Sequence, residues 1–338
     1  MTLYPTQLIT SSCDNAIGVP ADRAEMASQD VLPDLFSGSV NIKWKEGAPA
    51  PIARAQGCAV LFNKAVYVGG GFTSGDDQEN VRAIDIYDPD TDKWNTIDTP
   101  HALFAMTVLM SKLLVVGGMT NDGEVTNKVL TLENNHWKDY TEMPTARCMH
   151  AAVSHKSTMI VMGGQVGLTT LNTTELLDGA TDQWSKCDDL PKPLSFLQSV
   201  IVNDMVYILG GVTLVLGENS PKSVYGAPVQ NLSSNQLKWQ HLVDTPNSLL
   251  AAVSLRSKYL LTLGGGQEDN SPEMKLFNEV FTFNPSSSSW IPTSTLPLHV
   301  ASAAVASSND SRLVVIGGVI KVDEKDDATN KVWIGQFQ

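Results

Sequence analysis

The chain has 338 residues, of which 42% are hydrophobic and 17% are charged. Lys and Arg number 23 against 36 Asp and Glu, which gives a formal net charge of −13. Nucleic acids and anionic membranes attract clustered cations, so this composition argues against both as partners. The four cysteines show neither metal-ligand spacing nor the density of a disulfide scaffold, and the first residues do not resemble a secretory signal. We therefore expect a cytoplasmic protein.

Residues 1–38 differ in composition from the rest of the chain. They are rich in Ser, Thr, Asp and Ala, with Pro5, Pro20 and Pro33 scattered among them. This composition predicts an N-terminal tail that is flexible or lies on the surface, and a short helix over 21–31 is the alternative.

An internal repeat follows the tail. A hydrophobic run that ends in a glycine pair occurs six times, and the first glycines of successive pairs lie 46 to 54 residues apart. Such regular spacing is typical of a repeat architecture. The six runs are 65–70, 113–118, 159–164, 206–211, 260–265 and 313–318.

Each repeat contains further strand-like segments. In the first repeat, turn residues separate four segments, at 55–62, 65–70, 82–87 and 93–97. The second segment of every repeat is continuously apolar, as expected of a strand that is buried on both faces. A tryptophan follows each of the first five glycine pairs: Trp94, Trp137, Trp184, Trp239 and Trp290. The pattern predicts four short antiparallel strands in each repeat.

These motifs resemble the kelch repeat. The glycine pairs carry the resemblance, together with the segments Tyr87–Trp94 and Leu177–Trp184 and the phrases Pro51–Arg54 and Pro144–Arg147. It covers residues 39–338 and implies an all-β fold, a six-bladed kelch-type β-propeller. Repeats two, four, five and six depart from the pattern because they lack the arginine, and repeat four has an enlarged loop.

The two ends of the repeat region complement each other. The last repeat supplies three strands, at 299–307, 312–318 and 330–336, and then the chain stops. Residues 40–45 form a strand-like segment before the first repeat. We therefore predict that this N-terminal strand closes the last blade, with Trp44 as its tryptophan, because closure removes exposed sheet edges.

Asp88, Asp90 and Asp92 have the spacing of the first ligands in an EF-hand loop. Lys93 stands where such a loop has glycine, and Thr99 stands where it has glutamate. Aspartate is also favoured in the hairpin turn predicted here. The turn is therefore the preferred interpretation, and calcium binding is not expected.

Four histidines are candidate metal ligands. His150 and His155 lie five residues apart without a third ligand nearby, so a structural role is favoured. His101 and His299 are expected where inner strands begin, near the central channel, and could share a metal across it. Galactose-oxidase-like enzymes use a kelch-type propeller with copper, but their ligand motifs cannot be placed in this sequence. We therefore expect no cofactor and no metal.

The loops between the second and third strands carry much of the negative charge. They are expected at 71–81, 119–127, 165–172, 212–223, 266–277 and 319–328, and contain 13 acidic and 4 basic residues. Exposed loops are often acidic for solubility alone. The more specific hypothesis is an acidic rim that attracts a basic peptide or protein segment toward the channel. Arg54 and Arg147 would then anchor a carboxylate, or else would pair with a neighbouring loop acid.

The resemblance implies a non-catalytic protein–protein interaction module, an adaptor or scaffold of the kind that kelch propellers provide in ubiquitin-ligase or cytoskeletal assemblies. We expect a partner protein or peptide, with basic character, at the loop face and channel mouth. The alternative is a propeller enzyme or carbohydrate binder with a channel-mouth site, either galactose-oxidase-like or epimerase-like. The candidate partner-binding residues are Arg54, Asp76, Asp77, His101, Asp122, Arg147, Gln165, Glu268, His299, Asp323 and Asp326.

Overall fold

The computed structural model describes residues 32–37, 40–74, 79–213, 222–267, 274–308 and 311–338. The chain divides into two units, Met1–Leu32 and Pro33–Gln338. The helix expected over 21–31 lies outside the described residues, and so does most of the expected tail. Within the described ranges, no helix is both long enough and apolar enough to cross a membrane.

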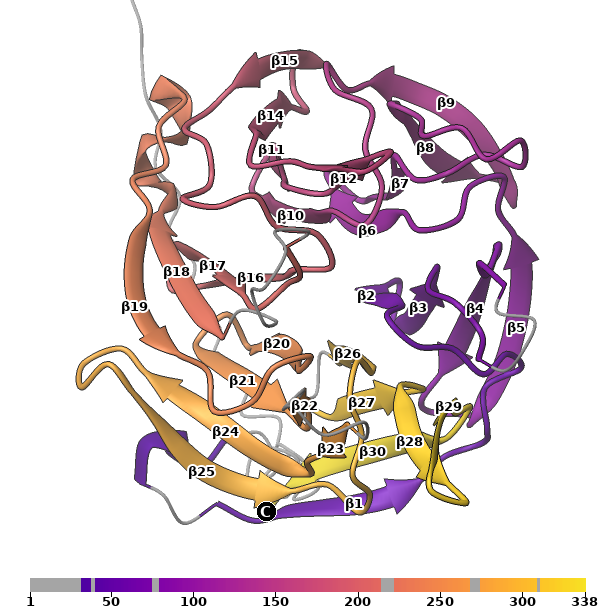
Figure 1. Cartoon of the computed structure of the whole chain (residues 1–338), viewed down its shortest axis with the longest axis vertical. Helices are drawn as coiled ribbons and strands as arrows, with labels where there is room; N and C mark the ends of the chain where they lie inside the picture. Colours follow the sequence, from indigo (N-terminus) through magenta and orange to yellow (C-terminus); the bar gives the residue numbers. More distant parts are fainter. Residues whose placement is uncertain (1–31, 38–39, 75–78, 214–221, 268–273, 309–310) are drawn as a thin grey trace, which may run out of the picture. The chain divides into compact units, whose positions relative to one another are not determined.

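The unit Pro33–Gln338 is a ring of six four-stranded antiparallel sheets, as predicted (Figure 1). Blade one contains β2 (Cys58–Phe62), β3 (Ala65–Gly69), β4 (Ala83–Asp88) and β5 (Lys93–Asp98). Blade two contains β6 (Ala105–Leu109), β7 (Lys112–Val116), β8 (Lys128–Glu133) and β9 (His136–Glu142). Blade three contains β10 (Ala151–His155), β11 (Thr158–Met162), β14 (Thr174–Asp178) and β15 (Gln183–Lys186).

The second half of the ring repeats this arrangement. Blade four contains β16 (Gln198–Val202), β17 (Met205–Leu209), β18 (Ser223–Pro228) and β19 (Gln240–Asp244). Blade five contains β20 (Ala251–Leu255), β21 (Tyr259–Leu263), β24 (Glu279–Asn284) and β25 (Ser289–Thr295). Blade six contains β26 (Ala304–Ser307), β27 (Leu313–Ile316), β30 (Val332–Phe337) and β1 (Ile42–Glu46).

Shorter elements lie in the loops and at the edge of the ring. Three two-stranded hairpins extend from the loops that follow the second strands: β12 (Gln165–Val166) with β13 (Thr169–Thr170), β22 (Gly266–Gln267) with β23 (Lys275–Leu276), and β28 (Val319–Val322) with β29 (Lys325–Ala328). A 3-10 helix, η2 (Val229–Ser234), lies between β18 and β19. Another, η1 (Leu35–Ser37), precedes β1, and its Leu35 is fully buried.

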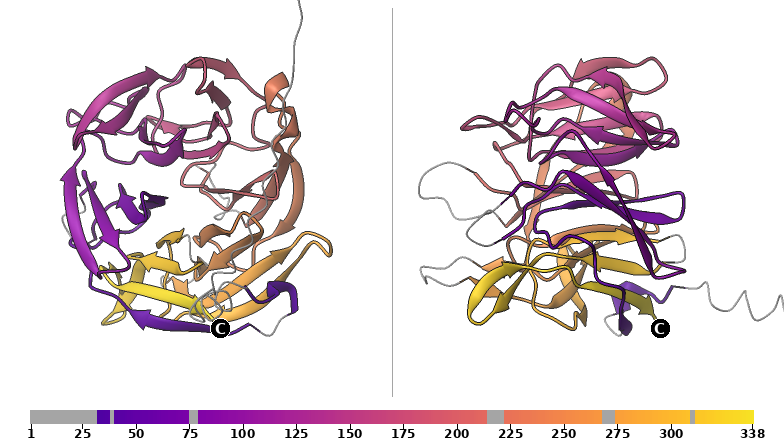
Figure 2. Two further views of the ribbon diagram at one scale, coloured as in Figure 1. Left: turned by 180° about the vertical axis from the view of Figure 1, so that it is seen from behind. Right: turned by 90° about the vertical axis from the view of Figure 1, so that its right-hand side faces the viewer.

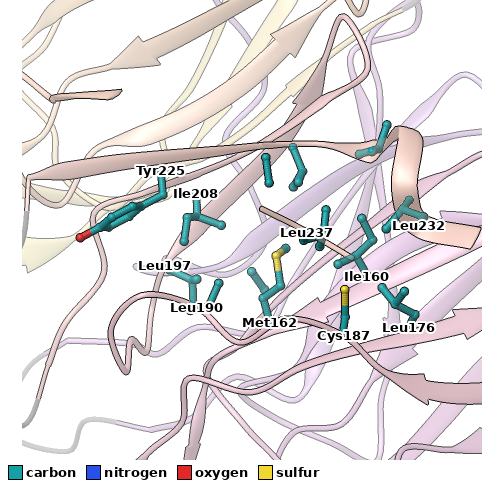
Figure 3. Packing of buried hydrophobic residues seen from close by; sticks show 14 of the residues in the cluster. Ile160, Met162, Leu176, Cys187, Leu190, Leu197, Ile208, Tyr225, Leu232 and Leu237 are labelled. Carbon is teal, nitrogen blue, oxygen red and sulfur yellow. The ribbon is translucent and has the colours of Figure 1, made fainter. Parts of the chain in front are cut away.

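The hydrophobic core lies between neighbouring blades. The second strands are almost completely buried, and all five residues of β21 are buried, as the apolar runs predicted. Between blades three and four, Ile160 and Met162 of β11 belong to the same cluster as Ile208 of β17 (Figure 3). Burial of such side chains stabilises the fold by about 1.5–3 kcal/mol each.

The glycine pairs end the second strands in a conformation that other residues rarely adopt. Gly117 and Gly118 have φ angles of 57° and 102°. A Cβ atom on Gly118 would lie 2.4 Å from the carbonyl oxygen of Ala102, so both the backbone angle and the available space require glycine. The equivalent pair in blade one is Gly70 and Gly71, one residue later than the pair predicted at the end of the run 65–70. Residue 69 is a glycine as well, so the sequence placed the pair one residue too early.

The outer-strand tryptophans connect successive blades by hydrogen bonds. In blades two to five, the indole N–H donates to the blade that precedes it in the chain. In blade one, it donates to the segment that follows β1. The donor–acceptor distances are 2.9 Å for Trp94 to the Ala48 carbonyl, 2.8 Å for Trp137 to the Asp98 carbonyl, 3.1 Å for Trp184 to the Thr141 hydroxyl, 3.4 Å for Trp239 to the Asp188 carbonyl and 3.0 Å for Trp290 to the Asp244 carbonyl.

The N-terminal strand closes the ring. β1 pairs with β30 so that Trp44 lies opposite Gly335 and Glu46 lies opposite Trp333. The backbone N–H of Gln338 also donates to the carbonyl of Asn41 at 3.0 Å. The predicted closure is therefore confirmed, although the strand runs over 42–46 instead of 40–45. Unlike the other outer-strand tryptophans, Trp44 has a buried indole N–H without a partner among the described residues.

The inner strands begin later than expected. β2 begins at Cys58 instead of residue 55, and β26 begins at Ala304 instead of residue 299. A residue with positive φ precedes each strand, Gln56 at 53° and Ser302 at 52°. A left-handed residue cannot continue an extended strand, so the strand begins only after it.

Candidate functional site

The two predicted arginine anchors are buried inside their blades. Arg54 forms an ion pair with Asp85 of β4, and neither side chain is exposed. Its guanidinium also donates to the carbonyl oxygens of Ala83 at 3.2 Å and Gly70 at 3.4 Å. Arg54 therefore presents no surface to a partner, and it pairs with a strand residue instead of a loop acid.

Arg147 has the same role in blade three. Its Nη2 lies 3.0 Å from Oε2 of Glu175, and the arginine side chain is completely buried. Its Nη1 donates to the carbonyl oxygens of Gly163 at 2.7 Å and Thr173 at 3.1 Å. Each arginine thus ties the end of the second strand to the beginning of the third.

A difference between the repeats indicates this pairing, although the prediction for the two arginines did not use it. Asp85 and Glu175 occupy equivalent positions, opposite Val68 and Val161 in the strand register. The four blades without the arginine have large apolar residues at that position: Leu130, Tyr225, Phe281 and Trp333. Because the acid occurs only in the repeats that have the arginine, comparison of the repeats indicates a buried ion pair.

The candidate histidines do not meet in the channel. His101 is 4% exposed and occupies in blade two the position that Arg54 has in blade one. His299 is exposed, and neither residue lines the central cavity. His150 and His155 do line it. In the described part of the chain, no cluster of three or more His, Cys, Asp or Glu side chains is arranged to hold a metal ion.

His150 is a buried, neutral histidine. It is 7% exposed, and neither ring nitrogen has a hydrogen-bond partner among the described residues. Burial lowers its pKa well below 6.5, and the charge of Arg147 lowers it further. The pKa of His101 is lowered as well, mainly by burial.

The Asp88–Asp92 turn is held by its own hydrogen bonds. Oδ1 of Asp88 accepts the backbone N–H of Asp90 at 2.9 Å, which is the pattern of an Asx turn. Oδ1 of Asp92 accepts the Tyr87 hydroxyl at 2.6 Å and the Ala48 N–H at 2.7 Å. Asp90 pairs with Arg312 of blade six. Each of the three carboxylates therefore has a partner within the protein, and the turn is held without a bound cation.

The inner strands of all six blades surround a central cavity of about 740 Å³. Its walls include small apolar residues such as Ala59 and Ala152, together with hydroxyl groups such as those of Thr107 and Ser199. Cys58 also lies on the wall, and burial raises the pKa of its thiol to about 12. Cys58 is therefore protonated at neutral pH and is a poor nucleophile.

Six residues with positive φ surround one mouth of the cavity. One comes from each blade, just before its inner strand, and all of them line the cavity. They are Gln56 (53°), Leu103 (53°), Met149 (54°), Phe196 (51°), Leu249 (48°) and Ser302 (52°). For a residue other than glycine, this conformation costs on the order of 1–3 kcal/mol of folding free energy.

Backbone hydrogen bonds join members of this ring between blades. The N–H of Met149 donates to the Leu103 carbonyl at 2.9 Å, and the N–H of Phe196 donates to the Met149 carbonyl at 2.7 Å. The N–H of Ser302 donates to the Leu249 carbonyl at 2.7 Å. We name the four apolar members the apolar crescent: Leu103, Met149, Phe196 and Leu249. They come from the consecutive blades two to five.

The loops between second and third strands lie on the same face as this mouth, since they leave the strands at that end of each antiparallel sheet (Figure 2). Asp122, Asp323 and Asp326 are exposed there. Asp326 pairs with Lys321 at 3.0 Å. Asp76, Asp77 and Glu268 lie outside the described residues.

The hairpin β12–β13 carries exposed apolar side chains on the loop face. Leu168 is 90% exposed and Val166 is 38% exposed. The candidate residue Gln165 lies in this hairpin, where its side-chain amide N–H donates to the Gly167 carbonyl and supports the turn. An isolated bridge between Cys148 and Gln165 connects the hairpin to the segment that carries Met149.

Comparison with known proteins agrees with the fold. A family model described as the KLHDC2/KLHL20/DRC7 Kelch-repeats domain matches residues 103–318, and a Kelch motif model matches residues 53–101. Six blades, each ending its second strand in a glycine pair, define the class of protein as a β-propeller. The chain belongs to the kelch-repeat family.

Several relatives are similar over part or most of the chain. Kelch-like protein 35 of Mus musculus is 25% identical over 93% of this chain and 51% of its own length. Kelch-like protein 40 of Xenopus tropicalis is 26% identical over 52% of this chain and 30% of its own length. The chain thus spans about half or less of these relatives. A solved structure titled "Structure of YjhT" has a TM-score of 0.69 at 16% identity and covers 86% of this chain and 99% of its own.

Proposed function

We propose that the propeller is a non-catalytic protein-binding module, an adaptor or scaffold that binds a basic peptide or protein segment on its loop face. The observation that carries the proposal is the placement of exposed carboxylates on the face that contains the mouth of the 740 Å³ cavity. A peptide bound there would contact several blades at once. Family membership supports the choice of a protein partner.

Two further features belong to the same proposal. Cys58, Cys148 and Cys187 are free thiols, which suits the reducing cytoplasm. The kelch resemblance also suggests that the module acts within a ubiquitin-ligase or cytoskeletal assembly.

A displayed library of random peptides tests the proposed function. Selection on the full chain should enrich peptides rich in Lys and Arg, and their affinity should fall with added salt because Coulomb attraction between exposed charges is screened. Asp122→Lys combined with Asp323→Lys should reduce binding by about tenfold, equivalent to about 1.4 kcal/mol. Glu133→Lys is the matched control, since Glu133 ends β8 at the opposite face.

Selection of no peptide, or of peptides without excess positive charge, would contradict the proposal. So would equal binding by the reversed variant and the control.

A further inference from the structure

The apolar crescent is costly to the fold in its present form. Leu103, Met149, Phe196 and Leu249 all adopt a left-handed backbone conformation that glycine would adopt without strain. The same ring position carries polar residues, Gln56 and Ser302, in blades one and six. Strained backbone that persists in a folded protein often marks a functional site.

The crescent continues into the neighbouring loop of blade two. Leu103 belongs to a buried cluster with Ala102 and Cys148, against which Met119 and Val125 pack together with Met149. Phe196 and Leu249 remain partly exposed and line the cavity. Leu103 is buried in its cluster, so Met149, Phe196 and Leu249 supply the accessible apolar surface at the mouth.

Two carboxylates belong to the loop whose base packs against the blade-two end of the crescent. Met119 and Val125 form an isolated bridge across the base of the blade-two loop, and Asp122 and Glu124 lie exposed between them. A peptide whose side chain lies on the crescent would therefore run past the loop that carries these two negative charges.

We propose that the apolar crescent binds a large apolar side chain of a peptide that also carries a basic residue facing Asp122 and Glu124. This proposal rests on the proposed function and names the chemistry of the bound segment. The apolar side chain supplies the buried anchor, and the basic residue fixes the direction in which the peptide crosses the mouth.

Glycine substitution at the ring separates binding from folding. Phe196→Gly combined with Leu249→Gly removes two side chains of the crescent and relieves strain at both positions. Peptides selected on the unmodified chain should bind this variant at least about tenfold more weakly. Its thermal midpoint should stay equal or rise. Gln56→Gly combined with Ser302→Gly is the matched control at the same ring position, and its binding should not change.

Phe196→Asn with Leu249→Asn provides a second variant, because asparagine tolerates the left-handed conformation without the added backbone freedom of glycine. It should show the same loss of binding. A fall in thermal midpoint in both variants would assign the crescent to folding and overturn the proposal.

The composition of the selected peptides gives an independent result. Peptides chosen by the unmodified chain should combine Leu, Ile, Phe or Trp with a basic residue, and the glycine variant should lose only the apolar preference. Basic peptides without that preference would overturn this proposal and leave the proposed function standing. Selection of no peptide would overturn both. The unmodified chain could instead dimerise as its concentration rises, and the glycine substitutions could abolish this dimer. That result would show that the crescent binds a second copy of the chain and would overturn the proposal of a peptide ligand.

Discussion

Arg147 lies 3.0 Å from Glu175 at one end of blade three, in an ion pair whose arginine side chain is completely buried. Arg147→Leu should lower the free energy of unfolding by about 3–5 kcal/mol, because it leaves Glu175 without its charged partner. Blade four has Leu194 and Tyr225 at these two positions. Arg147→Leu with Glu175→Tyr should therefore recover most of the loss in urea denaturation. Equal destabilisation in the single and double variants would show that the pair is not the origin of the effect.

The tryptophan hydrogen bonds between blades can be tested without removing an aromatic ring. Trp94→Phe deletes the donor to the Ala48 carbonyl and keeps most of the contact with Tyr87, whose ring centroid is 4.7 Å away. We expect a loss of about 1 kcal/mol in the free energy of unfolding. Trp44→Phe is the control, since the indole N–H of Trp44 has no partner in the described residues. A similar loss in both variants would trace it to packing.

Closure of the ring depends on the absence of a side chain at residue 335. A Cβ atom on Gly335 would lie 2.6 Å from Cζ3 of Trp44 and 2.8 Å from Cγ2 of Ile42. Gly335→Ala should lower stability by roughly 1–3 kcal/mol through overpacking. Adding Trp44→Leu should recover part of this loss if the ring of Trp44 is the obstacle. Calorimetry of the two variants gives the comparison, and an unchanged Gly335→Ala midpoint would contradict the packing of β1.

Stability should decrease in mild acid because of His150. Its pKa in the folded protein is well below 6.5, so the unfolded chain takes up the proton first as the pH falls. Stability is therefore fully present above pH 6.5 and declines below it, by up to about 1.4 kcal/mol per pH unit for this one proton. His101 contributes in the same direction.

His150→Leu should flatten this decline, since Leu197 and Leu250 occupy the equivalent positions in blades four and five. Urea denaturation of the unmodified chain and the variant at several pH values below 6.5 measures the difference. Parallel pH curves would show that His150 is not the titrating group.

The architecture could be predicted because each blade repeats the same physical pattern. A continuously apolar second strand, a glycine pair and an outer tryptophan recur at nearly constant spacing. Because the last repeat has only three strands, residues near Trp44 could be predicted as its fourth strand, and the strand register agrees. The predictions were weaker at strand boundaries, because the positive φ of Gln56 and Ser302 has no glycine to mark it.

The site was harder to predict because its chemistry depends on which side chains are buried. Arg54 could equally have faced solvent, and only its contact with Asp85 fixes it inside the blade. His101 and His299 both precede an inner strand, yet the first is buried and the second exposed. The apolar crescent was missed for another reason, since Leu103, Met149, Phe196 and Leu249 look like ordinary strand residues in the sequence.

The pairing of β1 with β30 also constrains synthesis and folding of the chain. Asn41 and Gln338 are 297 residues apart in sequence, and their side-chain amides join at 2.8 Å. On the ribosome, β1 must therefore wait for β30 to emerge before it finds its partner. Until then blade six cannot form, and the flanks of blades one and five that it covers stay open to chaperones or to a neighbouring nascent chain.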